Sequence, residues 1–329
     1  MSTTQPPATA EALPYPEHDK LGPLGSRASA LHDPLELRAK LLDEFNSAVH
    51  AARDAAAAVD TGSAVAVHDS RKALRRARAV LSMIASALPK GERRAVKTAL
   101  QEARRSLSTI RDHSVAPETL GQAPLSDDDR ETARRVLDSA AEAIPATAEI
   151  KQLLGEAAAR AAAQAEALEA ALPACVTWDD VSRGIRALYE DARHARRAGK
   201  VSKRWFHSWR RRSKELACAL EFVARQAGPR AAAIHGEVDA ITDALGPAVD
   251  LIMVREFVAT HGAGLAAESI DHLRAAVAAQ LDDLMKSARK TGRDAFEQKA
   301  KRFEKRLTKA VRRDLTPPDD ERTNGQLSD

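Results

Sequence analysis

The feature that most constrains the fold of this chain is a short basic pattern that occurs twice. The first copy lies within HDSRKALRRAR, and the second lies within HSWRRRSKELA, 139 residues further along the chain. The matching positions are His68, Arg71, Lys72 and Arg75 in the first copy, and His207, Arg210, Arg211 and Lys214 in the second. Two copies in register predict a chain with duplicated halves, each presenting one cationic helix.

Helical geometry gathers each copy into one stripe. At about 100° per residue, the four side chains of the first copy fall within about 100° of arc. Apolar residues such as Leu74 and Leu81 lie on the opposite side of that helix, as Leu216 and Leu220 do in the second copy. Like charges at this spacing destabilise a helix by roughly a few tenths of a kcal/mol per pair. A solvated face or a bound polyanion would compensate, and the repetition favours the polyanion.

Composition predicts an all-α protein. The chain has 329 residues, of which 44% are hydrophobic and only 3% are aromatic. Much of the apolar content is alanine, which is a strong helix former. The net charge of +4 results from 51 basic and 47 acidic residues, so the local clustering of cations is more informative than the total.

Several classes of function lack the residues that they need. Cys175 and Cys218 have no metal-binding or redox spacing, and we interpret them as two buried small side chains. No long apolar run or signal peptide occurs, which predicts a cytoplasmic protein with no membrane span. No glycine-rich phosphate loop, nucleophile elbow, cofactor motif or metal-ligand set is present. We therefore predict a binding module without catalytic residues, and not an enzyme.

Helix-start and helix-stop signals divide the chain into two predicted bundles with flanking tails. Residues 1–32 and 315–329 are rich in proline and small polar residues, so we expect both tails to be disordered. The first bundle, residues 33–173, opens at the capping sequence Asp33-Pro34-Leu35-Glu36. The second bundle, residues 177–313, opens at Thr177-Trp178-Asp179-Asp180. Each stretch has room for about four helices.

Within these bundles, the first basic stripe is expected on a helix over about residues 63–88. A loop is predicted from Pro117 to Ser126, before an alanine-rich stretch at 127–172 that forms one or two helices. The last two helices are expected at about 264–290 and 293–313.

The order and spacing of these motifs resemble the CHAD family, which is named for its histidine-bearing α-helical domain. In the first half, the residues that fit are His68, Arg71, Arg75, Arg76, Arg78, Leu107, Arg111 and Asp112. In the second half they are Tyr189, Arg193, His207, Trp209, Arg210, Arg211, Lys214, Leu245, Gly246 and Asp250. The resemblance covers residues 35–312, and Gly292 and Phe296 are similar to the family's C-terminal helix pair.

Membership would imply two four-helix bundles related by a pseudo-two-fold axis, with the basic helices facing each other across a central groove. In this family the groove binds inorganic polyphosphate, and some relatives associate with polyphosphate or polyhydroxyalkanoate granules. The residues that the resemblance assigns to polyphosphate are His68, Arg71, Lys72, Arg75, Arg76, Arg78, Arg104, Arg111, Tyr189, Arg193, His207, Arg210, Arg211 and Lys214. Ala217 and Cys218 stand where the family often has Arg and Tyr, so the second stripe is expected to be thinner.

These residue types suit a polymer of phosphates that has no base to read. Arginine forks can hold phosphate oxygens bidentately, and lysine adds a point charge. Arginines around His68 and His207 should resist histidine protonation until a polyanion binds. We therefore hypothesise that binding tightens as the pH falls from about 8 to 6. Asp112 and Asp250 are interpreted as structural residues that orient arginines.

Two other functions remain open. The stretch from Lys286 to Arg313 is strongly basic and could contact duplex nucleic acid without sequence specificity. Single-strand binding needs stacking aromatics, which the stripes lack. The third reading is a scaffold on granule surfaces, which would require an exposed apolar patch.

Overall fold

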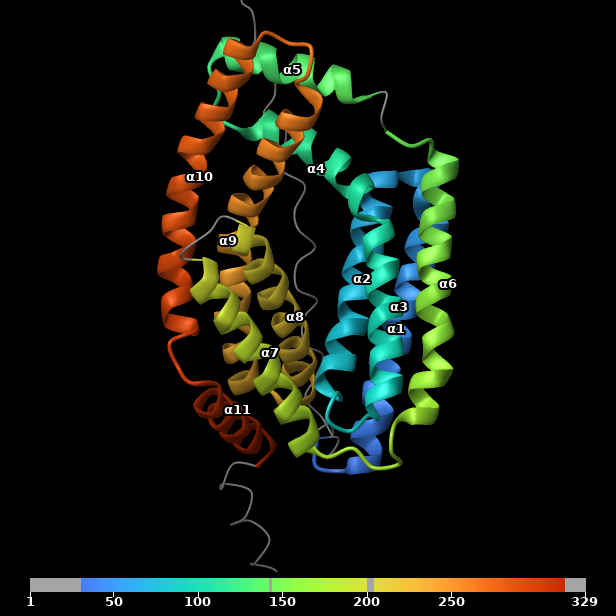
Figure 1. The fold of residues 1–329 in the computed structure, drawn as a ribbon. Coiled ribbons are helices and arrows are strands. Elements are labelled where there is room, and N and C mark those ends of the chain that lie inside the picture. Colours follow the sequence, from blue (N-terminus) through green and yellow to red (C-terminus); the bar gives the residue numbers. More distant parts are fainter. Residues whose placement is uncertain (1–30, 142–143, 200–203, 317–329) are drawn as a thin grey trace, which may run out of the picture.

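The computed structural model describes residues 31–141, 144–199 and 204–316 (Figure 1). These residues form eleven α-helices and one short 3-10 helix, and no strand occurs among them. The prediction of an all-α fold is confirmed. The tails that were predicted to be disordered lie almost wholly outside the described residues, although Leu31 and Leu315 at their inner edges are buried. Within the described ranges, every helix is too short or too polar to span a bilayer.

The first group of helices stands on the right of Figure 1. It consists of α1 (Pro34–Ala57), α2 (Ser63–Met83), α3 (Lys90–Ser106) and α6 (Thr147–Ala171), with the 3-10 helix η1 (Ala58–Thr61) between α1 and α2. Helix α1 packs against α2 and α6, and α3 packs against α6 and α2. The predicted N-cap of α1 is confirmed, because Asp33 Oδ1 accepts a hydrogen bond of 2.9 Å from Leu35 N.

The second group stands on the left of Figure 1. It consists of α7 (Trp178–Gly199), α8 (Arg204–Ala227), α9 (Pro229–His261), α10 (Ala267–Ala295) and α11 (Ala300–Leu315). Helix α8 packs between α7 and α9, α10 runs along α9, and α11 crosses α7 and α9. A Cβ atom on Gly292 of α10 would collide with the ring of Trp209 from α8, so glycine at this position leaves room for that ring.

Helices α4 (Ser108–Gln122) and α5 (Asp127–Ala141) link the two groups. Although they follow α3 in the sequence, α4 packs most extensively against α9, and α5 against α10 and α9. The loop predicted from Pro117 onward is wrong over its first part, because α4 continues through Pro117 to Gln122. Ala116 and Leu120 are buried on either side of this proline, so packing outweighs the local preference of proline to end a helix. The alanine-rich stretch forms two helices, α5 and α6.

The two groups meet where α2 packs against α7 and α8. A Cβ atom on Gly184 of α7 would collide with the backbone carbonyl oxygen of Met83 at the end of α2. Glycine is therefore required for this close approach. The contact sets α8, which carries the second basic stripe, beside α2, which carries the first.

Candidate anion-binding site

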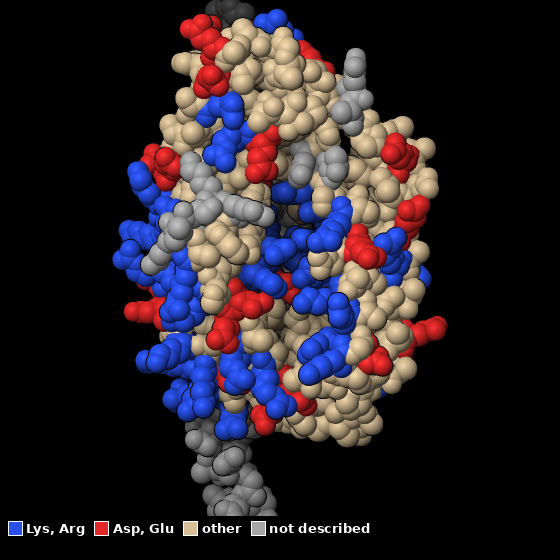
Figure 2. Space-filling model, viewed as in Figure 1, with Lys and Arg blue, Asp and Glu red and all other residues tan. Residues whose placement is uncertain are grey.

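A hollow between the two groups of helices is lined by Lys and Arg side chains (Figure 2). The cations that influence one another's charge in this region come from four helices: α2, α3, α4 and α8. We call them the basic cluster, which consists of His68, Arg71, Lys72, Arg75, Arg78, Arg104, Arg111, Arg210, Arg211 and Lys214. Ten of the fourteen residues assigned from the sequence are thus brought together.

Some arginines of the basic cluster are bound to protein acceptors. Arg71 Nη1 donates to the carbonyl oxygens of Arg104 at 3.3 Å and Leu107 at 3.1 Å, which are at the C-terminal end of α3. Arg111 on α4 forms an ion pair of 3.1 Å with Asp250 on α9. These two side chains hold α3 and α4 in place, so their guanidinium groups are already partly occupied.

A buried ion pair joins the two basic helices. Arg78 on α2 donates to Glu215 Oε2 on α8 at 3.1 Å, and Ser82 Oγ donates to Glu215 Oε1 at 2.8 Å. Glu215 and Arg78 are 3% and 8% exposed, so water contributes little to their solvation. Charges buried to this extent depend on their partners, and loss of either one leaves an uncompensated charge.

A second carboxylate, Glu44 on α1, binds two arginines from different helices. Arg76 on α2 donates to Glu44 Oε1 at 2.8 Å, and Arg225 on α8 donates to Oε2 at 2.7 Å. Although burial alone would raise it, the pKa of Glu44 is lowered by the hydrogen bonds and charges of these two arginines. Arg76 is therefore bound to the scaffold, which differs from its predicted role in contacting a polyanion.

The remaining cations of the basic cluster carry charge that the protein neutralises poorly. Burial, together with Arg210 and Arg75, lowers the pKa of Lys214 to about 7. Burial and the neighbouring arginines lower the pKa of Arg104 to about 9. The pKa of Arg75, that of Arg210 and that of Arg211 are also lowered, and burial is the largest cause in each case. Burial and mutual repulsion therefore disfavour positive charge at these positions, although Asp250 offsets part of the effect at Arg210 and Lys214.

Two buried guanidinium nitrogens of the basic cluster also lack a hydrogen-bond acceptor in the part of the chain that the structure describes. Among the described residues, no hydrogen-bond acceptor reaches the buried Nε of Arg104 or that of Arg210. Buried polar atoms in folded proteins are almost always hydrogen-bonded, so such atoms call for an explanation. The buried Nε atoms of Arg225 and Arg306 are in the same state although both side chains form ion pairs, so this feature is not specific to the basic cluster.

Each basic stripe begins with a histidine, His68 on α2 and His207 on α8. Burial is the largest cause that lowers the pKa of His68, and Arg75, Lys214 and Lys72 act in the same direction. The lowered pKa of His68 has the predicted direction, but burial is its largest cause and Asp69 opposes it. His207 is partly buried on α8, one turn before Arg211.

Tyr189 and Arg193 on α7 contact the turn between α10 and α11. The Tyr189 ring is fully buried and stacks on Phe303, and its hydroxyl lies 3.0 Å from the carbonyl oxygen of Ala295. Arg193 Nε donates to the carbonyl oxygen of Phe296 at 3.2 Å. Both side chains anchor the turn between α10 and α11, and a fully buried tyrosine cannot contact a polymer in the hollow.

Comparisons with known proteins agree with this architecture. The family model described as CHAD domain matches residues 30–259, which is more than half of the chain. The chain belongs to the CHAD domain family. The crystal structure of the CHAD domain from the plant Ricinus communis is similar, with a TM-score of 0.58 and 18% sequence identity. That similarity covers 80% of this chain and 92% of the plant chain, and it supports the fold alone. No curated protein matches the sequence significantly.

Several CHAD residues outside the stripes were harder to predict. Asp250 has the expected structural role, because it binds Arg111, whereas the side chain of Asp112 lies outside the described residues. Glu44 and Glu215 were not predicted, since nothing in their local sequence marks them as partners of distant arginines. Cys175 is exposed and not buried as expected. Among the described residues, no group of His, Cys, Asp or Glu side chains is arranged to hold a metal ion.

Proposed function

We propose that this CHAD protein binds inorganic polyphosphate in the hollow between α2 and α8, without catalysing a reaction. The observation that supports this most directly is the set of partly buried cations whose charge the protein neutralises only in part: Arg75, Arg104, Arg210, Arg211 and Lys214. A chain of phosphates supplies closely spaced negative charges and many oxygen acceptors. Binding would replace cation repulsion with charge-assisted hydrogen bonds.

Some residues of the hollow are proposed to contact polyphosphate, and others to hold the helices that position those contacts. His68, Lys72 and the five cations named above are the proposed contacts, together with His207. Arg71, Arg76, Arg78 and Arg111 hold the helices that position those contacts, because each is bound to another part of the protein. We propose no role in binding for Tyr189 and Arg193.

Calorimetric titration with long-chain polyphosphate at about 50 and 200 mM salt tests this proposal. The Arg75→Ala/Arg104→Ala/Arg210→Ala variant should lose roughly a hundredfold or more in affinity, since each charged contact contributes about 1.5–3 kcal/mol. The matched control replaces exposed cations elsewhere, as Lys40→Ala/Arg53→Ala/Arg135→Ala, and should bind like the wild type. Equal affinity in the cluster variant and the control would exclude the hollow as the site.

We also propose that the two groups of helices are diverged copies of one ancestral unit. The register of the stripes on α2 and α8, and the mutual packing of these two helices, support this idea. Association with polyphosphate granules follows as an expectation if the hollow binds the polymer. A fluorescent fusion that stays diffuse in cells with abundant granules would contradict that expectation.

A further inference from the structure

Helix α11 presents a second cationic surface on the outside of the molecule. Its cationic arc, which we call the α11 face, consists of Lys299 at the N-cap and Arg302, Lys305, Arg306, Lys309, Arg312 and Arg313 on the helix. All of these are exposed except Arg306, which is partly buried, and the exposed Lys301 lies beside them. At about 100° per residue the side chains of the α11 face span about 140° of arc. Side chains of Lys and Arg crowd the corresponding lower-left part of Figure 2.

The other side of α11 is anchored in the protein core. Phe303, Leu307 and Val311 are buried against the second group of helices. A helix that is fixed in this way presents its cations on a rigid support. The α11 face therefore does not need to become ordered when it binds a partner.

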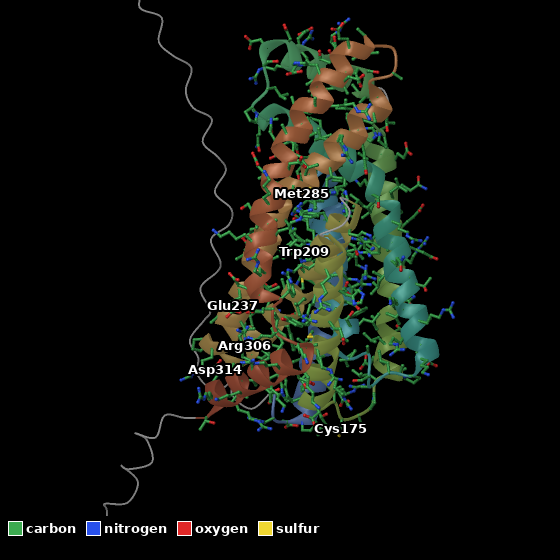
Figure 3. All side chains as sticks on the ribbon, turned by 60° about the vertical axis from the view of Figure 1, so that its left-hand side comes forward. Cys175, Trp209, Glu237, Met285, Arg306 and Asp314 are labelled. Atoms are coloured by element: carbon green, nitrogen blue, oxygen red, sulfur yellow. The ribbon has the colours of Figure 1, made fainter. Side chains whose placement is uncertain are left out.

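The two acidic residues of α11 are bound to other helices. Glu304 forms an ion pair of 3.0 Å with Arg186 on α7. Asp314 accepts from Ala231 N at 2.9 Å and pairs with Arg230 at 3.2 Å, which fixes the end of α11 to the start of α9 (Figure 3). Both carboxylates are therefore already paired with arginines of other helices.

One cation of the α11 face is already paired, and the others extend along the helix. Arg306 Nη2 lies 2.6 Å from Glu237 Oε2 on α9 (Figure 3). The helix has 16 residues and is therefore about 24 Å long. A shallow hollow of about 420 Å³ lies beside it and is lined by the cations Lys305, Lys309, Arg312 and Arg313, and also by the carboxylates Asp179 and Glu304. Cations are thus available along the whole length of the helix.

This surface is distinct from the basic cluster. None of the charged neighbours that shift the pKa of a cluster cation lies on α11. The α11 face also lies beyond residue 259, where the match to the family model ends. The two surfaces can therefore be altered independently.

We propose that the α11 face binds duplex nucleic acid through its phosphates, without reading bases. A convex row of hydrated cations suits a rigid duplex, which presents a fixed row of phosphates and releases counterions. A thin flexible polyphosphate chain would lose conformational freedom on this open surface and would gain only exposed contacts. The face has no exposed aromatic side chain for stacking single strands, and no apolar side chain for insertion into a bilayer.

The test measures fluorescence anisotropy of a labelled 30-base-pair duplex of arbitrary sequence at several salt concentrations. The Arg302→Gln/Lys305→Gln/Lys309→Gln/Arg312→Gln variant should bind roughly tenfold or more weakly, with the slope of log K against log salt reduced by about 3 to 4. The matched control, Lys40→Gln/Arg53→Gln/Arg94→Gln/Arg135→Gln, removes the same charge from exposed positions on α1, α3 and α5. It should leave the affinity and the slope near those of the wild type, and circular dichroism should report all three proteins as folded.

Polyphosphate titrations of the same proteins separate this inference from the proposed function. The α11 variant should retain polyphosphate affinity, and the Arg75→Ala/Arg104→Ala/Arg210→Ala variant should retain duplex affinity. Loss of duplex binding only in the cluster variant would place nucleic acid in the hollow and overturn the inference. Unchanged duplex binding in the α11 variant would also overturn the inference. So would an α11 variant that loses polyphosphate binding but keeps duplex binding, or a wild-type protein whose α11 face binds anionic vesicles but not the duplex.

Discussion

On α2, Arg71, Arg76 and Arg78 donate to protein acceptors, whereas on α8 burial and neighbouring cations lower the pKa values of Arg210, Arg211 and Lys214. Three of the four arginines in the first segment are therefore bound to protein acceptors, whereas in the second segment Arg212 is the arginine that pairs with carboxylates, Asp191 and Glu215. Arg75 is the exception on α2, since its pKa is also lowered. A count of cations in the sequence predicts a thinner second stripe, but the charge available to a ligand depends on which acceptors the fold supplies.

The largest expected effect comes from removing the carboxylate that joins the two stripes. Glu215→Ala leaves Arg78 buried without its partner, so we expect the free energy of unfolding to fall by about 3–5 kcal/mol. Urea denaturation monitored by circular dichroism measures the change. The control, Asp60→Ala, removes one partner of the exposed pair with Lys151 and should cost at most about 1 kcal/mol. A smaller loss in Glu215→Ala than in the control would mean that Arg78 does not depend on Glu215.

The next largest loss of stability is expected at the contact between Gly184 of α7 and the end of α2. In Gly184→Ala the new methyl group meets the backbone of Met83, which cannot move without shifting α2. We expect a loss of about 1–3 kcal/mol in the free energy of unfolding. Gly236→Ala on α9 is the matched control, because nothing lies within 4 Å of its Cβ position and alanine favours helix. If both variants were equally stable, the groups would not be packed as closely as described.

Removing the cation Lys214 from α8 should increase the free energy of unfolding, in contrast to the two substitutions above. Lys214→Met should stabilise the ligand-free protein by about 1–2 kcal/mol at neutral pH, while weakening polyphosphate binding. The folded-state pKa of Lys214, about 7, is below its ordinary value of 10.5. Its cost to stability therefore grows as the pH falls from about 10.5 to 7, and this part of the pH dependence should vanish in the variant. Denaturation curves at several pH values check this, with exposed Lys97→Met as the control. A destabilised Lys214→Met protein would contradict the account of the cluster.

Binding should also be coupled to protons. A polyanion beside Lys214 and His68 raises the pKa of each group, so complex formation near pH 7.5 should take up protons, and affinity should increase as the pH falls toward 6. Calorimetry in two buffers of different ionisation enthalpy gives the number of protons. Lys214→Met should remove most of the uptake above pH 7, and His68→Ala/His207→Ala should remove more of it below pH 7. Proton release on binding would contradict both assignments.

The smallest expected effect is a pH dependence in the stability of α5, which is bound to α10 through His272. His272 Nδ1 lies 2.8 Å from Asp129 Oδ1, and the hydrogen bond and charge of Asp129 raise the pKa of His272 above 6.5. This contribution is complete below pH 6.5 and is lost as the pH rises through the raised pKa of His272. Amide hydrogen exchange in α5 should therefore be slower at pH 6 than at pH 8, after correction for intrinsic rates, and His272→Ala should abolish the difference. Exchange that is equally slow at both pH values would exclude this role.

Local sequence signals predicted much of what is local in the structure. The cap at Asp33, the helices that carry both stripes and the all-α class follow from propensity and periodicity. The acceptors of the arginines could not be predicted in this way, because Arg78 and Glu215 are 137 residues apart and their pairing depends on how α2 docks on α8. Tertiary packing also explains why α4 continues through Pro117: burial of the neighbouring residues outweighs the tendency of proline to end a helix.

The position of α4 and α5 has a consequence for synthesis on the ribosome. Asp129 in α5 binds His272 in α10, which is 143 residues further along the chain. At about 5–20 residues per second, its partner follows roughly 7–30 seconds later. Until α9 and α10 have been made, α4 and α5 lack the helices that cover most of their apolar faces. We therefore expect nascent chains that end before α10 to engage holdase chaperones, and expression yield to depend on chaperone supply more than the stability of the finished fold would suggest.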